Sequence, residues 1–328
     1  YSISAILKEI TERIEAMRSG IETGDAVPSG YKYLDRVLYG FQKGKLYVIA
    51  ARPAVGKTVF MVNLVHNMVL KSTPAKKVAV FLLDQSAAVF LEKLLSCTTE
   101  IWLEKIIRGK LEDHEWNKLK ELGINRIMAT PLSLEDEAPM SVTDITRKCD
   151  ELIKASGLDI VFIDNLQLIK KENGLNPDEA TAKIMKSLKD HARTRNIPIV
   201  VLSQWSSAEE IKPGRKKKLQ LSDMQDTGPI GQEADALLFL YRPEYYDILE
   251  DEEGESLRGT TYIKIAKNRM GQLDTIRMKA KLHIQKFEDY EDDLVFSPKE
   301  LAKKNHRSNK KGKQNGTLFD EENEGDLF

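Results

Sequence analysis

The chain has 328 residues, and 41% of them are hydrophobic, which is enough to form the core of one α/β domain with extensions. Its 50 Lys and Arg residues almost balance its 51 Asp and Glu residues. The net charge of −1 therefore argues against a globally basic nucleic-acid-binding protein and leaves only a local basic surface open. No apolar run has the length of a membrane span, and no segment resembles a secretory signal. We therefore expect a cytoplasmic protein whose two cysteines, Cys97 and Cys149, are small core residues rather than metal ligands.

An amphipathic helix is predicted over residues 2–19, followed by a linker over residues 20–28. Apolar side chains recur there at helical spacing, with charged residues between them: Ile3, Ile6, Leu7, Ile10, Ile14 and Met17. The apolar face needs a partner, which is either the chain's own domain or a neighbouring subunit.

The first functional motif follows a predicted strand. Leu46–Ala50 is a short apolar run with β-branched residues, which predicts a buried strand, and apolar residues at helical spacing over 59–70 predict a helix. The segment between them fits a phosphate-binding loop that has Ala51 where the strict pattern has Gly. In such a loop the backbone N–H groups at the helix N-terminus surround a phosphate. The Lys57 ammonium reaches the β- and γ-phosphates, and the Thr58 hydroxyl binds Mg²⁺.

Two further predicted strands end in carboxylates. The strand over residues 77–83 ends at Asp84, which is placed either to activate water beside the phosphate loop or to cap the following helix. The strand over residues 160–163 ends at Asp164, the position at which phosphate-loop ATPases hold Mg²⁺ directly or through water.

The region between these two strands is predicted from its periodicity and its capping residues. We expect helical residues over 87–109 with a break near Thr98 and Thr99, a helix over 113–122, a strand over 125–129, an acidic loop over 132–140, and a helix that runs from a capping box at Ser141 to about Gly157.

After Asp164, a helix is predicted over residues 179–195. The strand over residues 197–204 ends at Gln204, which is either a functional side chain or a satisfied strand-end amide. Residues 206–219 are polar and predict a mobile loop, whose basic run at 215–218 either binds a ligand or is simply solvated.

The last predicted strands cover residues 236–241, 259–266 and 275–287. Lys267 and Arg269 follow the second of these and are two residues apart, so their side chains point the same way. They form either a joint clamp on one phosphate group or two solvated surface cations.

Several separated patterns resemble the ATPase domain of DnaB-type replicative helicases over about residues 25–290. The patterns are Pro28-x-Gly30-x-x-x-Leu34-Asp35, Gly40-x-x-x-Gly44, the Ala51-Arg52-Pro53 form of the phosphate loop, Asp164-x-Leu166-Gln167-Leu168, Leu221-Ser222-Asp223, Gly228-x-Ile230 and Gln232-x-Ala234-Asp235. Members of that family are hexameric ATP-driven motors. The resemblance therefore implies a RecA-like P-loop α/β fold, with a mostly parallel twisted sheet flanked by helices and an N-terminal linker helix.

The resemblance also implies roles for individual residues. ATP would be bound by Ala51, Arg52, Pro53, Ala54, Val55, Gly56, Lys57, Thr58, Val59 and Arg242, and Mg²⁺ by Thr58 and Asp164. Catalysis would use Lys57, Asp84 as the base, Gln204 as the γ-phosphate sensor, and Lys267 with Arg269 acting on the ATP of the adjacent subunit. DNA would be contacted by Arg215, Lys216, Lys217, Gln225, Asp226 and Gly228.

The partners implied by the resemblance are single-stranded DNA, other copies of the chain in a hexameric ring, a primase and a helicase loader. We expect a linker helix over residues 1–24 that packs on a neighbouring subunit, the ATPase domain over 25–297, and a charged, disordered tail over 298–328. The family's N-terminal collar domain is missing from this sequence. Its first residue, Tyr1, favours a cut at the linker over a natural short form.

Three departures from the family pattern keep alternatives open. Asp84 replaces a Glu, which withdraws the carboxylate by ~1.5 Å. The family's Arg-Glu-Ser-Gly segment has Gln225 in place of its Arg, and its Ser-Arg pair has Ser207 in place of its Arg. The chain could instead be a weakly hydrolysing, nucleotide-dependent assembly or regulatory module. A RecA-like strand-exchange or clock-type ATPase is a third possibility. Stimulation of ATP hydrolysis by single-stranded DNA would favour the motor over the module.

Overall fold

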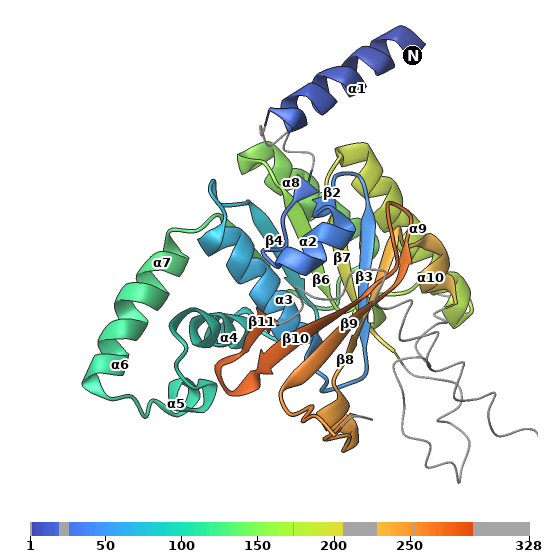
Figure 1. Ribbon diagram of the computed structural model, residues 1–328. Helices are drawn as coiled ribbons and strands as arrows, with labels where there is room; N and C mark the ends of the chain where they lie inside the picture. The colour runs from blue at the N-terminus through green and yellow to red at the C-terminus, as the bar shows by residue number, and fades with distance from the viewer. Residues whose placement is uncertain (1, 20–25, 173, 206–227, 252–253, 291–328) are drawn as a thin grey trace, which may run out of the picture. The chain divides into compact units, whose positions relative to one another are not determined.

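A nine-stranded sheet forms the core of the unit over residues 1–289 (Figure 1). The computed structural model describes residues 2–19, 26–172, 174–205, 228–251 and 254–290. The strand order is β11-β10-β9-β8-β3-β7-β6-β4-β5. The strands are β3 Leu46–Ala51, β4 Val78–Leu82, β5 Leu132–Glu135, β6 Ile160–Asp164, β7 Ile199–Gln204, β8 Ala236–Tyr241, β9 Thr260–Asn268, β10 Thr275–Lys281 and β11 Lys286–Asp289.

The sheet has a parallel part and an antiparallel extension. Strands β5, β4, β6, β7, β3 and β8 are parallel, whereas β9, β10 and β11 each pair antiparallel with the strand before them. A separate short pair joins β1 Ala26–Val27 to β2 Phe41–Gln42. The predicted mostly parallel sheet is therefore confirmed, with the last three strands added antiparallel at one edge.

The central strands are buried on both faces, as expected for parallel strands covered by helices. In β3, Tyr47, Ile49 and Ala51 pack into one core cluster, whereas Leu46 and Val48 pack into the other. The first cluster includes side chains of α3 Lys57–His66 and α4 Ala87–Thr99, and the second includes those of α8 Val142–Ser156 and α9 Pro177–Arg195. Figure 1 shows these helices beside the sheet. This alternation explains why the strand sequences are continuously apolar.

The described helices agree with most of the predicted ones. They are α1 Ile3–Arg18, α2 Lys32–Leu38, α3 Lys57–His66, α4 Ala87–Thr99, α5 Leu103–Arg108, α6 Asp113–Lys118, α7 Asn125–Met128, α8 Val142–Ser156, α9 Pro177–Arg195 and α10 Pro229–Glu233. Two π-helical turns extend α3 and α6, over Asn67–Lys71 and Leu119–Ile124. Cys97 and Cys149 are buried as predicted, and burial raises the pKa of both thiols to about 12.

Two predictions between β4 and β6 are wrong. The strand expected over residues 125–129 is the helix α7, which continues the preceding π-helical turn, and Met128 there is exposed. The acidic loop expected over residues 132–140 contains the edge strand β5, which pairs parallel with β4. Leu132 and Leu134 pack against the first core cluster, so apolar and polar side chains do alternate along β5. The acidic residues after Leu134 hide this pattern in the sequence.

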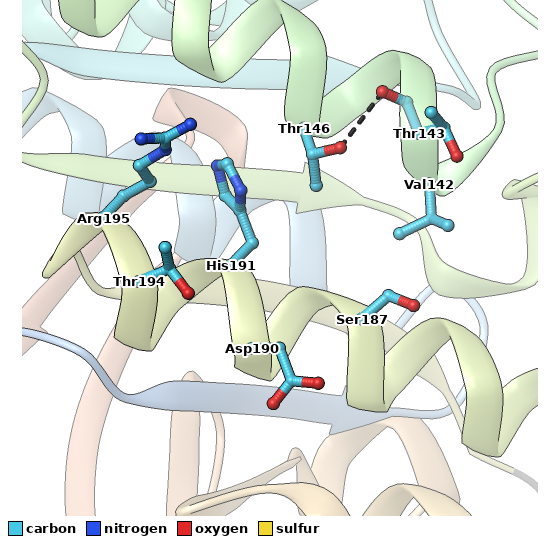
Figure 2. Close-up of a pocket in the computed structure, with 8 residues that line it drawn as sticks. All are labelled: Val142, Thr143, Thr146, Ser187, Asp190, His191, Thr194 and Arg195. Atoms are coloured by element: carbon cyan, nitrogen blue, oxygen red, sulfur yellow. Dashed lines mark hydrogen bonds between the residues drawn. The ribbon is translucent and has the colours of Figure 1, made fainter.

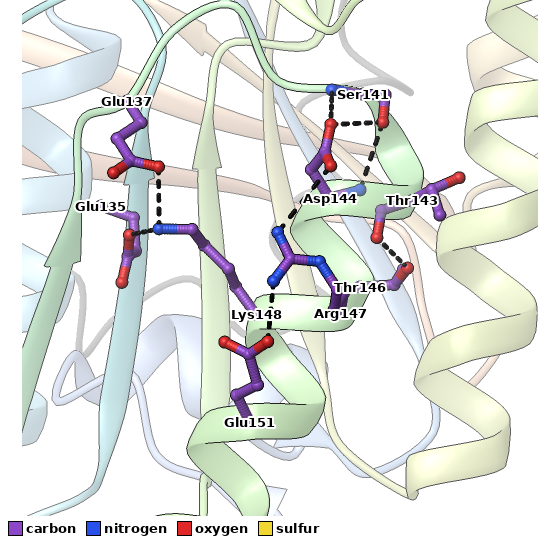
Figure 3. Close-up of polar contacts among 9 residues, drawn as sticks. All are labelled: Glu135, Glu137, Ser141, Thr143, Asp144, Thr146, Arg147, Lys148 and Glu151. Carbon is purple, nitrogen blue, oxygen red and sulfur yellow. Dashed lines mark hydrogen bonds and ion pairs between the residues drawn. The ribbon is translucent and has the colours of Figure 1, made fainter.

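The start of α8 is fixed by local hydrogen bonds, which Figure 3 shows. The Ser141 hydroxyl accepts from the Asp144 N–H at 3.2 Å, and the Asp144 carboxylate accepts from the Ser141 N–H at 3.0 Å. This reciprocal pair is the predicted capping box. One turn later, Lys148 pairs with Glu135 and Glu137, so α8 is also tied to the edge strand β5 (Figure 3).

The helix α1 is formed as predicted, and its apolar side chains are exposed in the described chain. Ile3 is 76% exposed, Leu7 56% and Ile14 49%. No helix in the described residues has the length and apolar character needed to cross a membrane.

A buried asparagine joins α3 to the last strand of the sheet. The Asn63 side chain, 2% exposed, donates to the carbonyls of Val59 and Gln285 at 2.8 Å each and accepts from the Phe287 N–H at 2.9 Å. It thereby satisfies two backbone groups of the segment entering β11 that have no water available. The antiparallel extension thus depends on a polar contact with the helix that follows the phosphate loop.

Replacing Asn63 with Leu should lower the free energy of unfolding by roughly 2–4 kcal/mol, because the Gln285 carbonyl and the Phe287 N–H would stay buried without partners. Urea unfolding at unchanged m-value measures this loss. Asn117, which is exposed on α6, provides the control, since Asn117→Leu should change stability by less than ~0.5 kcal/mol. Equal effects of the two substitutions would contradict the bridging role of Asn63.

Candidate functional site

The predicted phosphate loop lies between the end of β3 and the start of α3. Gly56 precedes α3 with a φ of 118°, in the left-handed region that favours glycine, and Ala54 has a φ of 59°. The first N–H groups of α3 lack partners within the helix, so this helix end is suited to bind a phosphate. The predicted nucleotide-binding residues Ala51, Arg52, Pro53, Ala54, Val55, Gly56, Lys57, Thr58 and Val59 form this strand end, loop and first helical turn.

A hydroxyl–carboxylate pair lies at the start of α3. The Thr58 Oγ1 donates to Asp164 Oδ2 at 2.9 Å, and Asp164, at the end of β6, is only 2% exposed. Both residues offer oxygen atoms, the ligand type that Mg²⁺ prefers, and Mg²⁺ in ATPases takes few protein ligands because water and phosphate supply the rest. The two residues therefore fit the predicted metal site. Within the described ranges, no group of three or more His, Cys, Asp or Glu side chains could hold a metal instead.

Burial and neighbouring opposite charges shift the pKa values of Lys57 and Asp164 in opposite directions. Burial lowers the pKa of the Lys57 ammonium, and the nearby carboxylates of Asp164 and Asp84 partly oppose this effect. Burial raises the pKa of Asp164, and the Thr58 hydrogen bond and the Lys57 charge oppose it. The site therefore contains a half-buried cation and a buried carboxylate that stabilise each other's charged forms.

Asp84 follows β4 and is exposed, beside a group of polar side chains that sequence reasoning missed. Asn165 Nδ2 donates to Asp84 Oδ2 at 3.5 Å, and Gln85 Nε2 donates to Asp164 Oδ2 at 3.5 Å. Lys93 Nζ donates to Gln85 Oε1 at 2.6 Å. Burial lowers the pKa of Lys93, and the charges of Asp164 and Asp84 oppose it. A chain of hydrogen bonds therefore links α4 to the predicted metal-binding carboxylate.

One signal in the sequence could have identified Lys93. On α4 the side chains of Phe90, Leu94 and Cys97 are buried, and Lys93 falls on the same helical face. A charged residue at a core-facing position indicates a buried partner. Asn165 and Gln85 gave no such signal, because their roles depend on the strand order of the sheet.

Gln204 ends β7 directly beside the phosphate loop. It pairs in register with Ala51, and the next residue, Trp205, donates its N–H to the Ala51 carbonyl at 2.9 Å. The Gln204 backbone is held by Gln167, which accepts from the Gln204 N–H at 3.0 Å and donates to its carbonyl at 3.0 Å. The Gln204 side chain itself is exposed, so it is positioned to contact a ligand at the loop.

Arg242 follows β8 and is only partly exposed. Its Nε and Nη1 atoms are buried without hydrogen-bond partners among the described residues. Its guanidinium lies 5.9 Å from the Tyr245 ring centre, and the Arg52 guanidinium lies 5.9 Å from the Tyr246 ring centre. The segment after β8 therefore contacts the phosphate loop. Unpaired buried N–H groups are costly, so the predicted role of Arg242 in binding an anion fits this geometry.

The Lys267 and Arg269 side chains point the same way, as their spacing predicted, and both donate to backbone carbonyls of α10. Lys267 Nζ donates to the carbonyls of Gly231 at 2.6 Å and Gln232 at 2.9 Å, and Arg269 Nη2 donates to Gln232 at 3.0 Å. The Arg269 N–H donates to the Asp235 carbonyl at 2.9 Å.

This cation pair lies at the amino-terminal end of the parallel strands, whereas the phosphate loop lies at their carboxyl-terminal end. The Asp235 N–H donates to the Leu46 carbonyl at the beginning of β3, whereas the phosphate loop follows Ala51 at the end of β3. At about 3.3 Å per residue, this places Arg269 roughly 16 Å along the sheet from the start of the loop.

Most of the predicted DNA-binding residues lie outside the described residues: Arg215, Lys216, Lys217, Gln225 and Asp226. Gly228 is described and precedes α10 with a φ of 52°.

A shallow depression of about 370 Å³ lies between α8 and α9 (Figure 2). It is lined by Val142, Thr143, Thr146, Ser187, Asp190, His191, Thr194 and Arg195. None of the predicted site residues is among them, and α8 and α9 pack on the other face of the sheet from α3. The Arg195 guanidinium is already paired with Asp150 at 2.6 and 2.7 Å. We assign no function to this depression.

A phosphate loop after a central parallel strand, with a carboxylate at the end of a nearby strand, defines a RecA-like P-loop NTPase. Residues 26–289 match the family model described as the DnaB-like helicase C terminal domain, and the chain belongs to that family. It is 34% identical over 294 residues to the replicative DNA helicase DnaB of Geobacillus stearothermophilus, covering 88% of this chain and 62% of the relative. It is 32% identical over 304 residues to the replicative DNA helicase DnaC of Bacillus subtilis, covering 90% of this chain and 64% of the relative.

Two solved structures share the fold. The "ATPase Domain of G40P" superposes with a TM-score of 0.76 at 30% identity, covering 88% of this chain and 99% of that one. A DnaB-like replicative helicase, described with its interactions with primase, superposes with a TM-score of 0.73 at 30% identity, covering 89% of this chain and 67% of that one. The predicted RecA-like fold is thus confirmed, and this chain spans a little less than two thirds of the two curated relatives.

Removing the Asp164 charge should lower the pKa of Lys57 further, because burial would remain while the larger of its two carboxylate attractions is lost. Asp164→Asn should therefore lower this pKa, and Asp84→Asn should lower it by a smaller amount. Titration of ¹³Cε-labelled lysine by NMR, with Lys57→Arg used to assign the signal, measures both shifts. An unchanged Lys57 pKa in Asp164→Asn would contradict this electrostatic description.

Proposed function

We propose that this chain is the ATP-hydrolysing motor domain of a replicative DNA helicase, which translocates on single-stranded DNA and unwinds duplex DNA during replication. The observation that carries the proposal is the phosphate loop beside the Thr58–Asp164 pair and Asp84, at the carboxyl ends of parallel strands, in a member of the DnaB-like family. The Nε and Nη1 atoms of Arg242 are buried without partners among the described residues, and this supports an anionic ligand near the same loop.

The reaction would be an in-line attack of water on the γ-phosphate of ATP, in which the protein mainly positions groups and stabilises charge. The N–H groups at the start of α3 and the Lys57 ammonium hold the phosphates. Mg²⁺ held by Thr58 and Asp164 would neutralise charge on the phosphate oxygens. Asp84 orients the attacking water and accepts its proton, and Gln204 contacts the γ-phosphate and relays its presence.

Lys267 and Arg269 would stabilise the transition state in the adjacent subunit. The geometry supports action between subunits, because within one chain these cations and the phosphate loop lie at opposite ends of the parallel strands. An extended Arg side chain is too short to cover a separation of roughly 16 Å. The active species would therefore be an oligomer, and we propose the hexameric ring of the family.

The proposed partners follow from the family and from the structural relative. That relative is described as interacting with primase, and we propose a primase and a helicase loader as partners of the whole protein in the cytoplasm. Single-stranded DNA would be contacted by Gly228 and by the predicted residues that lie outside the described ranges.

The second candidate is a weakly hydrolysing assembly or regulatory module. The substitutions at Asp84, Ser207 and Gln225 favour it, because they remove a methylene group and two cations that the family pattern contains. Measuring ATP hydrolysis with and without single-stranded DNA separates the two functions. A rate stimulated by DNA supports the motor, and a slow rate that DNA does not change supports the module.

Lys57→Ala should abolish ATP hydrolysis. The backbone N–H groups would still surround the phosphates, but the positive charge of Lys57 beside the transferring phosphate would be lost.

Arg269→Ala should lower kcat by roughly 10³–10⁵-fold with nucleotide binding nearly intact, as for other arginine fingers. Oligomers mixed from the two variants should recover activity, because each contributes what the other lacks. Wild-type turnover by Lys57→Ala would contradict the assignment of the phosphate-binding site. Mixed oligomers that recover no activity would contradict the action of Arg269 between subunits.

Asp84→Glu should raise kcat if Asp84 is a base whose carboxylate is withdrawn by one methylene, since a displacement of ~1 Å can cost about 10²-fold. Asp84→Asn should lower kcat, with nucleotide affinity little changed in both variants. Steady-state kinetics with ATP measures these effects. A slower Glu variant would mean that the backbone has shifted to suit Asp. Native rates in both variants would exclude Asp84 as the base and favour the regulatory module.

The exposed apolar face of α1 supports the proposed role of residues 1–24 as a linker helix that packs on a neighbouring subunit. We propose that α1 packs on the segment between α4 and β5 in sequence, which exposes several large apolar side chains: Trp102, Ile107, Trp116, Leu122 and Met128. Covering both surfaces in an oligomer would remove apolar area from water.

Ile6→Glu on α1 should therefore weaken self-association by more than about tenfold, because it places a charge on the face that would be buried. Light scattering across a dilution series measures the mass of the assembly. Lys8→Glu, on the polar face of the same helix, is the control and should leave the mass unchanged. If Ile6→Glu also leaves the mass unchanged, α1 packs on its own domain.

A further inference from the structure

A cluster of three cations surrounds the C-terminal end of α10. Lys267 and Arg269 donate to the carbonyls of its last turn, as described above. Lys189 on α9 also donates from Nζ to the Glu233 carbonyl at 2.7 Å. Carbonyl groups at the end of a helix lack partners within it and carry partial negative charge, so they attract cations. Lys189 is not among the residues that the family resemblance assigns to catalysis.

The carboxylate of Asp235 is shared between this cluster and the sheet. The Asp235 side chain is 6% exposed, and its Oδ2 accepts from the Leu46 N–H at 3.0 Å. Its Oδ1 lies 3.4 Å from Lys189 Nζ and 3.5 Å from Arg269 Nη1. Charge-assisted hydrogen bonds are normally 2.7–2.9 Å long. Two cations thus share one oxygen, and neither makes a close contact with it.

The two cations differ in exposure. The Lys189 side chain is 14% exposed, whereas the Arg269 side chain is 49% exposed and continues to the molecular surface. A buried carboxylate that faced Arg269 alone would attract its guanidinium more strongly, since charges interact more strongly away from water. The position of Lys189 therefore limits how firmly Asp235 holds Arg269.

The cations also repel each other within the cluster. Burial lowers the pKa of Lys267, and the charges of Arg269 and Lys189 lower it further, against the opposing charges of Asp235 and Glu233. An incoming anion would relieve this repulsion, which matches the class of ligand expected for the pair, a phosphate group.

We propose that Lys189 is a positioning residue for Arg269: it competes for Asp235 Oδ1 and thereby keeps the guanidinium available to the phosphate of an adjacent subunit. This inference rests on the proposed function, in which Arg269 acts on the neighbouring ATP. Lys189 itself contacts no nucleotide in this scheme, and its effect passes through Arg269.

The test compares Lys189→Met with Lys189→Met/Asp235→Asn in the full chain. Lys189→Met should lower kcat for ATP about tenfold with KM unchanged, because Asp235 then holds Arg269 alone. Adding Asp235→Asn should restore most of the lost rate, since the amide oxygen still accepts from Leu46 but no longer carries the charge. Lys189→Arg should turn over near the wild-type rate. Lys186→Met, an exposed neighbour on α9, is the matched control and should not change kcat.

Mixed oligomers locate the defect. Lys189→Met chains mixed with Lys57→Ala chains should recover activity, because the Lys57→Ala chain supplies an intact Arg269 to the intact phosphate loop of its neighbour. A Lys189 that only supports α10 would give a double variant as slow as or slower than Lys189→Met, with a lower melting temperature, and that result would overturn the proposal. An unchanged kcat in Lys189→Met would also overturn it, provided that Arg269→Ala is inactive. If Arg269→Ala keeps the wild-type rate, the proposed role of Arg269 fails first.

Discussion

The hydrogen bond from Thr58 to Asp164 is the contact on which the candidate site depends. It joins the first turn of α3 to the end of β6, two segments that are far apart in sequence. They meet because only β7 lies between β3 and β6 in the sheet and the three strands are parallel. Their carboxyl ends therefore lie close together at the same end of the strands. The same order places Gln204 beside the phosphate loop and Asp84 beyond Asp164. One register therefore fixes the relative positions of the groups from four strands.

The polar groups around Asn63 and those around the phosphate loop have different properties. Around Asn63 every donor and acceptor described is paired, and that network ties the last strand to α3. Around the phosphate loop, Asn165 Oδ1 and two nitrogen atoms of Arg242 are buried without partners among the described residues. Unpaired buried groups cost free energy, so a ligand at the loop that bonded to these atoms would stabilise them. Thr261 Oγ1 and Asp289 Oδ1, away from the loop, are also buried without partners among the described residues.

The sequence predicted what depends on local pattern. The phosphate loop, the strands that end at Asp84 and Asp164, and the capping box at Ser141 all have short-range signatures, and the structure has each of them. Residues 125–128 and 132–135 were predicted wrongly because both runs are short, and tertiary contacts decide their conformation. The roles predicted for the site residues from the family remain proposals, although their geometry is compatible with them.

What the sequence could not provide is the order of the strands. The spacing of Lys267 and Arg269 predicted that their side chains point the same way, and both donate to the Gln232 carbonyl. Nothing in the spacing predicts at which end of the parallel strands they lie. The contacts made by Gln85, Gln167 and Lys189 are recognisable only once that order is known, because each bonds to a residue on a distant strand or helix.

The antiparallel direction of β9 has a consequence for assembly. It puts the phosphate loop and the cation pair at opposite ends of the parallel strands, so each chain would carry half of two different catalytic centres. An open row of copies then always has one incomplete centre at each end, whereas a closed ring has none. Opening a ring, for example to admit a DNA strand, would cost the assembly one working centre until it closes again. Ring closure and full catalytic capacity would then be the same structural event.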